Sequence, residues 1–558
     1  MTNPKVKLLT NFQESDFKGL LEEQPLTAAE SYQSLLRSLR RKNGFNLLFV
    51  RCSPVQADEI IRGISQDLPN KNIQVLQLDS ETDNLYEKIV DLPNYTNLNI
   101  LFVRGLENAL LRYEEAESEG YFLSSQSPVY GGTWAGVPKI LGYLNLSRER
   151  FERQFPFTLV FLLPEFALRY FIRRASDFFD WYSGVYEFPT DKDILHREIR
   201  RLVYLDSDLD TYKQFTPQQR QEKLAEIKAY LSDSPSLDPV QASELWHEKG
   251  LIHQMGKEYE QAIASYDRAL EIKPDYPEAW NGRGVALHNL GRFEEAIASY
   301  DRALEIKPDY HKAWNNRGIA LGNLGRLEEA IASYDRALEI KPDDHEAWNN
   351  RGTALGNLGR FEEAIASYDR ALEIKPDDPY AWNNRGVALG NLGRFEQAIA
   401  SYDRALEIKP DYHEAWFIRG VVLNNLGRYE EAIASYDRAL EFKPDKHEAW
   451  NNRGVALGNL GRFEEAIASY DKALEIKPDY HEAWNNRGNA LGNLGRFEEA
   501  IASFDRALEI KPDDHEVWYN RGGALDNLGR FEQAITSWDR ALEIKPDYHQ
   551  AWYNRGIA

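Results

Sequence analysis

The chain has 558 residues, a formal net charge of −22 and 42% hydrophobic residues, so it can form more than one packed domain. The acidic balance argues against binding to nucleic acid or to anionic membranes. A single cysteine, Cys52, excludes an internal disulfide framework and a cysteine-based zinc site, as expected for a cytoplasmic protein.

The first part of the chain predicts a flexible tail and then an α/β domain. Residues 1–25 contain no apolar segment of a secretory signal. Apolar runs predict four strands, at 45–52, 73–79, 99–105 and 157–163. Helices are expected at 26–42, from about Pro54, at 138–155 and at 165–182. Since continuous apolar strands that alternate with helices are buried on both faces, residues 26–189 are predicted to form a parallel sheet with flanking helices.

The stretch LGYLNLSRERFERQFPFTLVFLLPEFALRYFIRRASDFFDWYSGVYEF (141–188) resembles the degenerate P-loop NTPase-like domain, of the AAA/STAND kind, that precedes repeat arrays in large bacterial proteins. Working members hold phosphates with a glycine-rich loop that ends in Lys-Ser/Thr. This chain instead has RCSPVQADEII at 51–61, without Gly or Lys, and keeps only Glu107 after the third strand. We therefore expect no nucleotide cofactor and no hydrolytic activity.

Two further features precede the repeats. Cys52, at the end of the first predicted strand, is interpreted as a small buried core residue, because only one histidine, His196, is available before the repeats to activate a nucleophile. Residues 190–242 are charged, have helical character and contain three prolines. They are predicted to form a helical linker.

From residue 243 the sequence repeats with a period of 34 residues. Tryptophans mark the period at 246, 280, 314, 348, 382, 416, 450, 484, 518 and 552. In residues 447–480, Trp450 and Leu457 belong to a first apolar helix stripe, and Phe463 and Tyr470 belong to a second. One such helix pair cannot bury its own apolar faces, so neighbouring pairs are expected to stack over 243–558, as nine full repeats and a partial tenth.

The pattern W-x3-G-x2-L…G-x-F…A-x3-Y-x2-A…P resembles the tetratricopeptide repeat (TPR) family. The resemblance implies an all-α superhelical solenoid of helix pairs, with the first helices lining a concave groove that binds peptides or proteins. The chain departs from the family where Arg453 and its equivalents replace Leu, and the Asp of SYD, such as Asp335 or Asp369, is the predicted partner. The first repeat is irregular, because Gly256 comes one residue earlier than the period requires, and is expected to act as an atypical cap.

The motif AWNNRG, at 449–454 and elsewhere, raises a binding hypothesis. Glu448, Asn452, Val455 and Asn459 fall on one helix face, which the resemblance places in the groove, whereas the first asparagine of each pair is expected to lie off that face. The candidate partner-binding residues are Asn316, Asn350, Asn384, Asn452, Asn486, Asn520, Asn554, Glu346, Glu414, Glu448 and Glu482. A row of carboxamides can bind an extended peptide backbone without reading its sequence. Local helix-end chemistry is the alternative, above all for the series of Asn459.

Amides and carboxylates on this face are expected to favour neutral or basic protein segments. A clamp for a terminal carboxylate, used by some family members, needs lysines on the groove face in two repeats, and only Lys312 lies at such a position. The histidines that begin seven repeats are interpreted as solvated residues and not as metal ligands, because each lies a repeat away from the next. No metal, cofactor, nucleic-acid or membrane partner is expected.

The leading hypothesis is a non-enzymatic protein-interaction scaffold. The alternative is a STAND-like, nucleotide-controlled signalling switch with the repeats as its sensor. Self-association through the N-terminal domain or through the last repeat is a further expectation. The sequence stops at AWYNRGIA, within a first helix, so a partial helix that acts as a cap and a longer natural chain both stay open.

Overall fold

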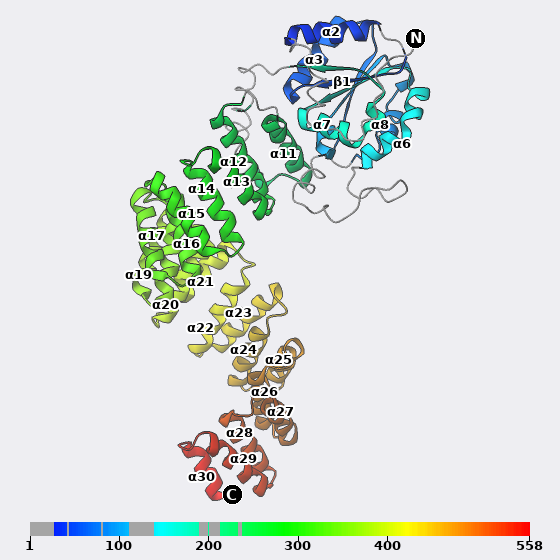
Figure 1. The fold of residues 1–558 in the computed structure, drawn as a ribbon. Helices are drawn as coiled ribbons and strands as arrows, with labels where there is room; N and C mark the ends of the chain where they lie inside the picture. The colour runs from blue at the N-terminus through cyan, green and yellow to red at the C-terminus, as the bar shows by residue number, and fades with distance from the viewer. Residues whose placement is uncertain are drawn as a thin grey trace. The chain divides into compact units, whose positions relative to one another are not determined.

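The computed structural model describes residues 27–41, 44–79, 82–110, 139–188, 199, 212–232 and 237–558. The chain divides into two compact units, Met1–Pro308 and Asp309–Ala558. The first unit holds an α/β domain and the first helix pairs of the repeat array, and the second holds repeat helices alone (Figure 1). The predicted tail and most of 190–211 lie outside the described residues, and the predicted domain boundaries stay a prediction.

The α/β domain contains one parallel sheet of five strands. The strands are β1 (Asn46–Arg51), β2 (Ile73–Gln77), β3 (Ile100–Arg104), β4 (Thr158–Leu163) and β5 (Tyr182–Glu187). Their order is β2-β3-β4-β1-β5, and every neighbouring pair is parallel. The predicted parallel sheet and its four predicted strands are therefore confirmed.

The fifth strand corrects the helix that was predicted over 165–182. Helices α7 (Glu165–Arg174) and α8 (Ser176–Phe179) end before β5 begins. None of the six residues of β5 is fully buried, because the strand lies at the edge of the sheet. It therefore lacks the continuous apolar run that identified β1, β3 and β4. It also lacks the three apolar residues, Ile73, Val75 and Leu76, that identified the other edge strand, β2.

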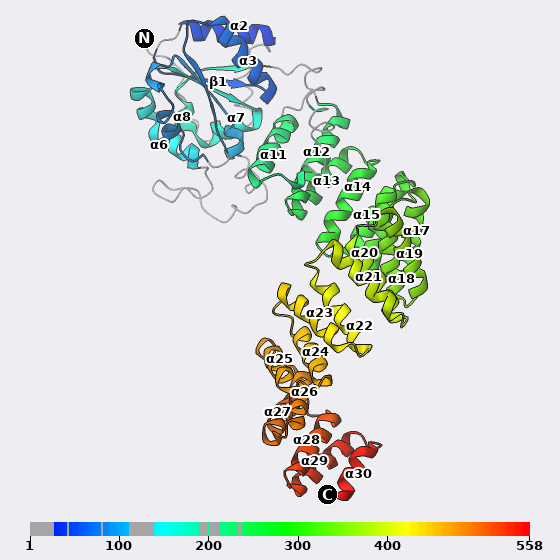
Figure 2. The same cartoon turned by 180° about the vertical axis from the view of Figure 1, so that it is seen from behind.

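Helices cover both faces of this sheet (Figures 1 and 2). One face packs against α2 (Ala28–Arg41) and α3 (Pro54–Asp67), and the other against α4 (Leu85–Val90), α6 (Lys139–Gln154), α7 and α8. Strand β1 alternates between the two cores: Leu48 and Val50 face the first, and Leu47 and Phe49 the second. A short 3-10 helix, η1 (Tyr95–Asn97), precedes β3.

Helix α11 (Pro217–Ser232) packs on the first helix of the array, α12 (Pro239–Met255). Leu224 and Tyr230 share a buried cluster with Leu245 and Ile252 of α12. The hydroxyl of Tyr212, just before α11, donates to the buried carboxylate of Glu248. The segment predicted as a helical linker therefore also covers the apolar face that a preceding repeat would otherwise cover.

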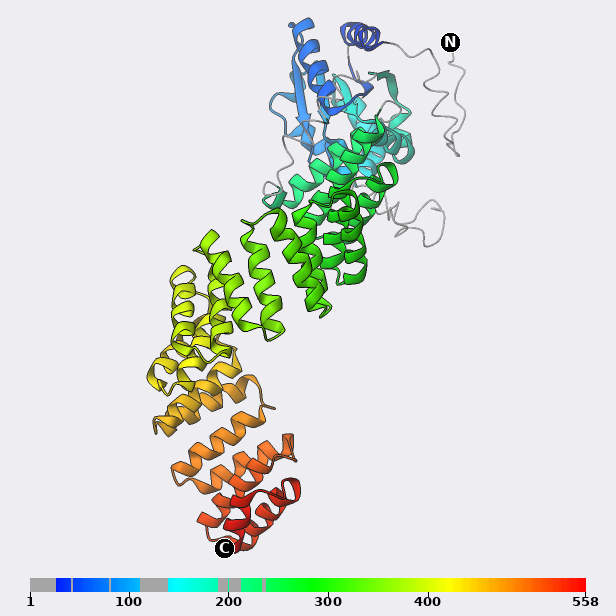
Figure 3. The same ribbon diagram turned by 90° about the vertical axis from the view of Figure 1, so that its left-hand side faces the viewer.

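The remaining helices form pairs that follow one another along the chain (Figure 3). In the first unit they are α13 (Tyr259–Ile272), α14 (Pro277–Asn289) and α15 (Phe293–Ile306). In the second unit they are α16 (His311–Asn323), α17 (Leu327–Ile340), α18 (His345–Asn357), α19 (Phe361–Ile374), α20 (Pro379–Asn391), α21 (Phe395–Ile408), α22 (His413–Asn425), α23 (Tyr429–Phe442), α24 (His447–Asn459), α25 (Phe463–Ile476), α26 (His481–Asn493), α27 (Phe497–Ile510), α28 (His515–Asn527), α29 (Phe531–Ile544) and α30 (His549–Ile557). This arrangement is the predicted solenoid of helix pairs.

Each pair has the same internal packing, which α24 and α25 illustrate. Helix α24 ends at Asn459, and the turn after it is closed by Gly461, whose φ of 75° is the left-handed conformation that glycine adopts most easily. A Cβ atom on Gly454 would lie 2.6 Å from the ring of Tyr470, so only glycine lets the two helices approach this closely. The indole Nε1 of Trp450 donates to the carbonyl of Pro444 at 2.9 Å and fixes the preceding turn.

The first repeat keeps this backbone despite its shifted glycine. Lys257, one period before Gly291, has φ of 63°, whereas Gly256 has φ of −75°. A lysine therefore occupies the left-handed position at the end of α12, which is less favourable than a glycine there.

Candidate partner-binding face

Within residues 309–558, arginine side chains fasten a helix pair to the preceding one. Arg487 Nε donates to Asp471 Oδ1 of the preceding pair at 2.6 Å, and its Nη1 donates to Ser503 Oγ of its own pair at 2.7 Å. The guanidinium also lies 5.8 Å from the ring of Trp484. Both hydrogen bonds recur at Arg351, Arg385, Arg419, Arg453 and Arg521. The predicted pairing of this arginine with the Asp of SYD is confirmed.

Both asparagines of AWNNRG connect neighbouring repeats. The second asparagine of one repeat donates to the first of the preceding repeat: Asn350 to Asn315 and Asn384 to Asn349 at 3.2 Å, Asn486 to Asn451 and Asn520 to Asn485 at 3.1 Å. We call this series the asparagine ladder. The expectation that the first asparagine lies off the shared face is wrong. Asn451 follows Glu448 by three residues, and this spacing places two side chains on the same helix face.

Shallow hollows lie along the ladder between successive first helices. One of about 310 Å³ is lined by His311, Lys312, Asn315, Asn316, Lys341, Asp344, His345 and Glu346. The next, of about 430 Å³, is lined by His345, Glu346, Asn349, Asn350, Lys375, Asp378, Pro379 and Tyr380. We call the surface that carries these residues and their 34-residue equivalents the asparagine face. Lys341 and Lys375 of the EIKP turns also line it. The sequence did not predict these lysines as site residues, because they lie outside the first helices.

The structure brings the predicted site residues to this face in two ways. Asn316, Asn350 and Glu346 line the hollows directly. Asn384, Asn486 and Asn520 donate along the ladder, Asn452 accepts from Asn451 at 3.2 Å, and Asn554 donates to the hydroxyl of Tyr519 at 3.0 Å. Glu414, Glu448 and Glu482 occupy the position of Glu346, and 52%, 45% and 54% of their side chains are exposed.

The later asparagine series has a local role. Asn391 Nδ2 donates to the carbonyl of Val387 at 2.9 Å, and Asn493 Nδ2 donates to that of Asn489 at the same distance. Asn289 and Asn527 make the equivalent bond within their own helices. These contacts support the interpretation of the series of Asn459 as helix-end chemistry.

The ladder is interrupted at the sixth repeat, where Phe417 and Ile418 replace the two asparagines. The side chain of Ile418 has no N–H to donate, and the buried Oδ1 of Asn383 is left without a partner. Within residues 309–558, which the structure describes without a gap, the buried side-chain polar atoms without a partner are Asn383 Oδ1, Tyr402 Oη, His413 Nδ1 and Asn424 Oδ1. A buried acceptor without a donor costs roughly 1–3 kcal/mol, so this interruption lowers stability.

The histidines that begin the repeats lie beside carboxylates of the same helix. His481 Nδ1 is 2.9 Å from Glu482 Oε2, and His413 Nε2 is 3.3 Å from Glu414 Oε1. In the part of the chain that the structure describes, no group of three or more His, Cys, Asp or Glu side chains is arranged to hold a metal ion.

The sheet places a second candidate position at the carboxyl ends of β1 and β4, because open parallel sheets bind ligands where the connections after two adjacent strands run in opposite directions. Arg51 occupies this position, with Nη2 2.5 Å from Glu165 Oε2 and Nη1 3.1 Å from Glu187 Oε1. The N-terminus of α3 is closed by a capping box: Ser53 Oγ accepts from Gln56 N at 3.3 Å, and Gln56 Oε1 accepts from Ser53 N at 3.0 Å. The backbone N–H groups that would hold a phosphate thus bind the chain's own side chains.

Two other residues that the sequence analysis singled out lie near this edge. Cys52 is 3% exposed within the core under α2 and α3, which confirms its interpretation as a core residue, and His196 lies outside the described residues. The Oε2 atom of Glu107 is buried without a partner among the described residues, and burial raises the pKa of this carboxyl to about 7.

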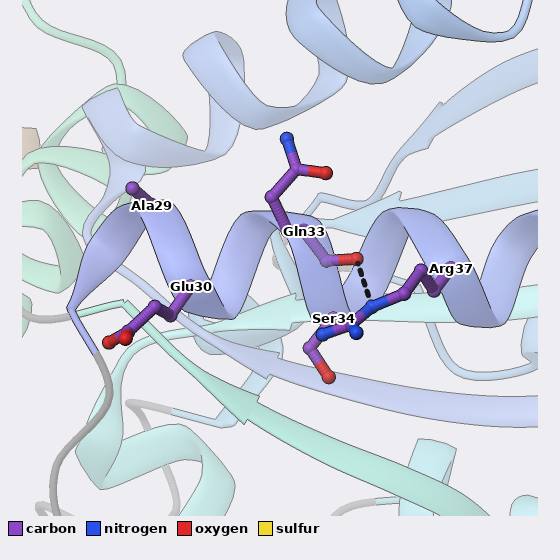
Figure 4. Close-up of a pocket in the computed structure, with 5 residues that line it drawn as sticks. All are labelled: Ala29, Glu30, Gln33, Ser34 and Arg37. Carbon is purple, nitrogen blue, oxygen red and sulfur yellow. Dashed lines mark hydrogen bonds between the residues drawn. The ribbon is translucent and has the colours of Figure 1, made fainter.

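A further hollow, of about 390 Å³, lies against α2. Ala29, Glu30, Gln33, Ser34 and Arg37 line it, and Arg37 Nε donates to the carbonyl of Gln33 at 3.2 Å (Figure 4). All five residues come from one helix, so no groups from other elements converge on a ligand there. None of the helices in the described ranges is long and apolar enough to cross a membrane.

Comparisons with known proteins identify the array. The sequence profile of the family described as tetratricopeptide repeat matches residues 253–311, 312–379, 383–447, 440–481, 451–515, 485–549 and 519–558, which together cover more than half of the chain. The matches begin at 253, so they do not test the resemblance of the α/β domain to P-loop NTPases. No curated protein matches the chain.

Solved structures with a similar fold cover parts of the chain. YrrB, a TPR protein with an unusual peptide-binding site, is 27% identical, with 34% of this chain and 96% of YrrB aligned at a TM-score of 0.31. The MamA protein is 23% identical over 31% of this chain and 94% of its own, at 0.29. A tetratricopeptide repeat protein from Parabacteroides merdae is 19% identical over 44% and 98%, at 0.34. At these TM-scores the likenesses support no functional conclusion.

Proposed function

Because the chain belongs to the tetratricopeptide repeat family, we propose that it is a scaffold that binds a neutral or basic segment of a partner protein on the asparagine face of residues 309–558. Proteins of this family are generally protein-interaction scaffolds. The proposal rests on one observation: half-exposed carboxylates recur beside carboxamides at the same position of successive repeats.

The carboxylates supply the preference for charge. Glu414, Glu448 and Glu482 stand one repeat apart, so a bound segment that follows the array meets them in turn. Each attracts an ammonium or guanidinium group and repels a carboxylate, and salt screens this attraction because the groups are exposed. An acidic segment is therefore expected to bind weakly.

The carboxamides supply contacts that do not depend on the sequence of the ligand. Each has two N–H groups and an oxygen with two lone pairs. A ladder link such as Asn486 to Asn451 uses one N–H of the donor and one lone pair of the acceptor. The remaining N–H group and lone pairs of each carboxamide can bind the alternating C=O and N–H groups of an extended backbone.

Peptide titration tests this function. Labelled extended peptides, basic, neutral or acidic, are titrated with the full chain at low and physiological salt, and binding is followed by fluorescence anisotropy. We expect basic peptides to bind tightest. The triple variant Glu414→Gln, Glu448→Gln, Glu482→Gln should bind them about tenfold more weakly, with a smaller dependence on salt.

The matched control removes the same charge from second helices, with Glu430→Gln, Glu464→Gln and Glu498→Gln. These residues are exposed in the first turns of α23, α25 and α27, and this variant should bind as the wild type does. Tighter binding of acidic peptides, or an equal loss in the control, would contradict the proposal.

We propose further that the α/β domain is a docking or assembly surface that does not bind nucleotide. The capping box at α3 and the ion pairs of Arg51 support this proposal, because they occupy the groups and the space that a phosphate needs. Calorimetric titration of the full chain with MgATP should give no binding heat. Micromolar binding would favour the alternative, a nucleotide-controlled switch.

A further inference from the structure

We propose that the sixth repeat is the anchor point of the asparagine face, where the array holds an aromatic or large aliphatic side chain of its partner that lies next to a Lys or Arg. This inference rests on the proposed function and adds a location and a ligand chemistry to it. It is carried by the fifth and sixth repeats, where Tyr380 replaces the carboxylate and Phe417 and Ile418 replace both asparagines. At Tyr519 and Tyr553 an aromatic residue replaces only the first asparagine, and the second is kept.

The substitutions lie at positions that line the hollows in other repeats. Tyr380 stands where other repeats have Glu346, Glu414 or Glu448, and it is 51% exposed. One repeat later, Phe417 and Ile418 stand where Asn349 and Asn350 line a hollow, and both are partly exposed. Aromatic side chains at such positions are the usual anchors of protein interfaces.

The side chains around these residues hold them in place. The rings of Tyr380 and Tyr412 meet edge to face with centroids 5.4 Å apart, and Lys409 Nζ donates to the hydroxyl of Tyr380 at 3.0 Å. Lys446 Nζ lies 4.4 Å from the centre of the Phe417 ring. Both lysines are held against aromatic rings of the chain itself. Tyr380 and Phe417 are therefore expected to present fixed apolar surface to a ligand and not mobile side chains.

Phe417 contacts Tyr436 and Lys446, but the interruption loses hydrogen bonds that other repeats make. It removes two ladder links, the one from position 418 to Asn383 and the one from Asn452 to position 417. It leaves Asn383 Oδ1 without a donor, and Asn383 is only 6% exposed. The neighbouring repeats show that two asparagines at 417 and 418 would fit the same backbone. A departure from the local rule that lowers stability is expected where a site serves binding.

The charges beside the anchor point indicate what flanks the apolar side chain. Glu414 and Glu448 lie on the same face in the sixth and seventh repeats, with 52% and 45% of their side chains exposed. The lysines of this part of the face have partners in the chain: Lys409 contacts Tyr380, Lys446 lies against Phe417, and Lys443 pairs with Asp445 at 3.1 Å. A Lys or Arg next to the apolar residue of the partner would therefore meet a carboxylate.

Three short Gly/Ser peptides test the inference. The anchor peptide carries an Arg-Trp pair, the anchorless peptide carries Arg-Ala, and the uncharged peptide carries Ser-Trp. We expect the full chain to bind the anchor peptide at least about tenfold more tightly than either of the others, measured by fluorescence anisotropy.

The deciding variant restores the ladder, with Phe417→Asn and Ile418→Asn. It should fold with a higher melting temperature, since it regains the donor for Asn383, and it should bind the anchor peptide no better than the anchorless one. A second variant, Tyr380→Glu, places the residue of the other repeats at that position and should reduce the same preference without touching the ladder.

The outcomes separate the two proposals. An anchor preference that survives in both variants, or that is absent from the wild type while basic peptides still bind, overturns the anchor point and leaves the proposed function intact. Absence of binding by every basic peptide overturns the proposed function together with the anchor point. Loss of the preference in both folded variants, with the anchorless peptide bound at least as tightly as by the wild type, supports the inference.

Discussion

The α/β domain and the repeats of residues 309–558 differ in the contacts that stabilise each of them. The sheet domain depends on contacts between residues far apart in the sequence, whereas each repeat depends on contacts between residues close together in the sequence. In the sheet, Asn46 of β1 pairs with Thr158 of β4, and the core under it collects residues from β1 to α8. In the array, Arg487 binds Asp471 and Ser503, 16 residues before and after it, and lies against the ring of Trp484. A defect should therefore spread through the whole sheet domain but stay within one junction of the array.

The largest expected effect comes from the centre of the sheet core. Phe161 is fully buried, and its ring lies 5.3 Å from that of Phe49 and 5.5 Å from that of Phe171. Phe161→Ala should cost about 3–5 kcal/mol of folding free energy. In hydrogen exchange followed by mass spectrometry, peptides from all five strands should lose protection together while those from α22 to α29 keep it. A loss of protection confined to β4 would contradict the expectation that a defect spreads through the whole sheet domain.

A smaller and local effect is expected at a helix contact within one repeat. Gly454→Ala places a Cβ 2.6 Å from the Tyr470 ring and should destabilise the array by about 1–3 kcal/mol. Gly458, in the same helix, has no atom within 4 Å of an added Cβ, so Gly458→Ala should stabilise by about 0.5–1 kcal/mol. Urea unfolding measures both. Equal effects of the two changes would show that the ring moves aside at no cost.

The ladder offers a test of coupling between neighbouring repeats. Asn486→Leu removes the donor to Asn451 Oδ1, which is buried, and should cost about 1–2 kcal/mol. In the double variant with Asn451→Leu the cost should fall, because the buried acceptor Asn451 Oδ1 is removed and Asn452 Oδ1, which loses its bond from Asn451, is partly exposed to water. A double-mutant cycle on urea midpoints gives the coupling energy. Strict additivity would mean that the bond contributes nothing.

The smallest expected effect lies in the first repeat, at the turn between α12 and α13. Lys257→Gly places a glycine at the left-handed position that Gly291 occupies one repeat later, and should stabilise the first repeat by roughly 0.5–1 kcal/mol. Gly291→Ala, the reverse change at the equivalent turn, should destabilise by a similar amount. Protection of α12 and α13 peptides in hydrogen exchange reports both changes, and a loss of protection in the lysine variant would refute the expectation.

The sequence predicted the array well because its contacts are local. The 34-residue period identifies the helix pairs, and the pairing of Arg351 with Asp335 follows from the cost of an unpaired charge at a packed position. Strands β1, β3 and β4 could be predicted for a related reason: strands buried on both faces are continuous apolar runs. Strand β2, at one edge of the sheet, could be predicted because Ile73, Val75 and Leu76 are apolar, although only Leu76 is buried. The edge strand β5 could not, since its half-exposed residues have no such run.

What the sequence by itself determined is therefore the period, the helix pairs and the chemical character of their faces. Only the tertiary structure decided what the two asparagines of AWNNRG do. A helical stripe places Asn452 on a face, but whether a carboxamide meets a ligand or the next repeat depends on how closely two helices approach, as Asn486 and Asn451 do at 3.1 Å. The effect of Phe417 and Ile418 became visible in the same way, because a missing hydrogen bond is a property of two repeats in contact and not of either repeat alone.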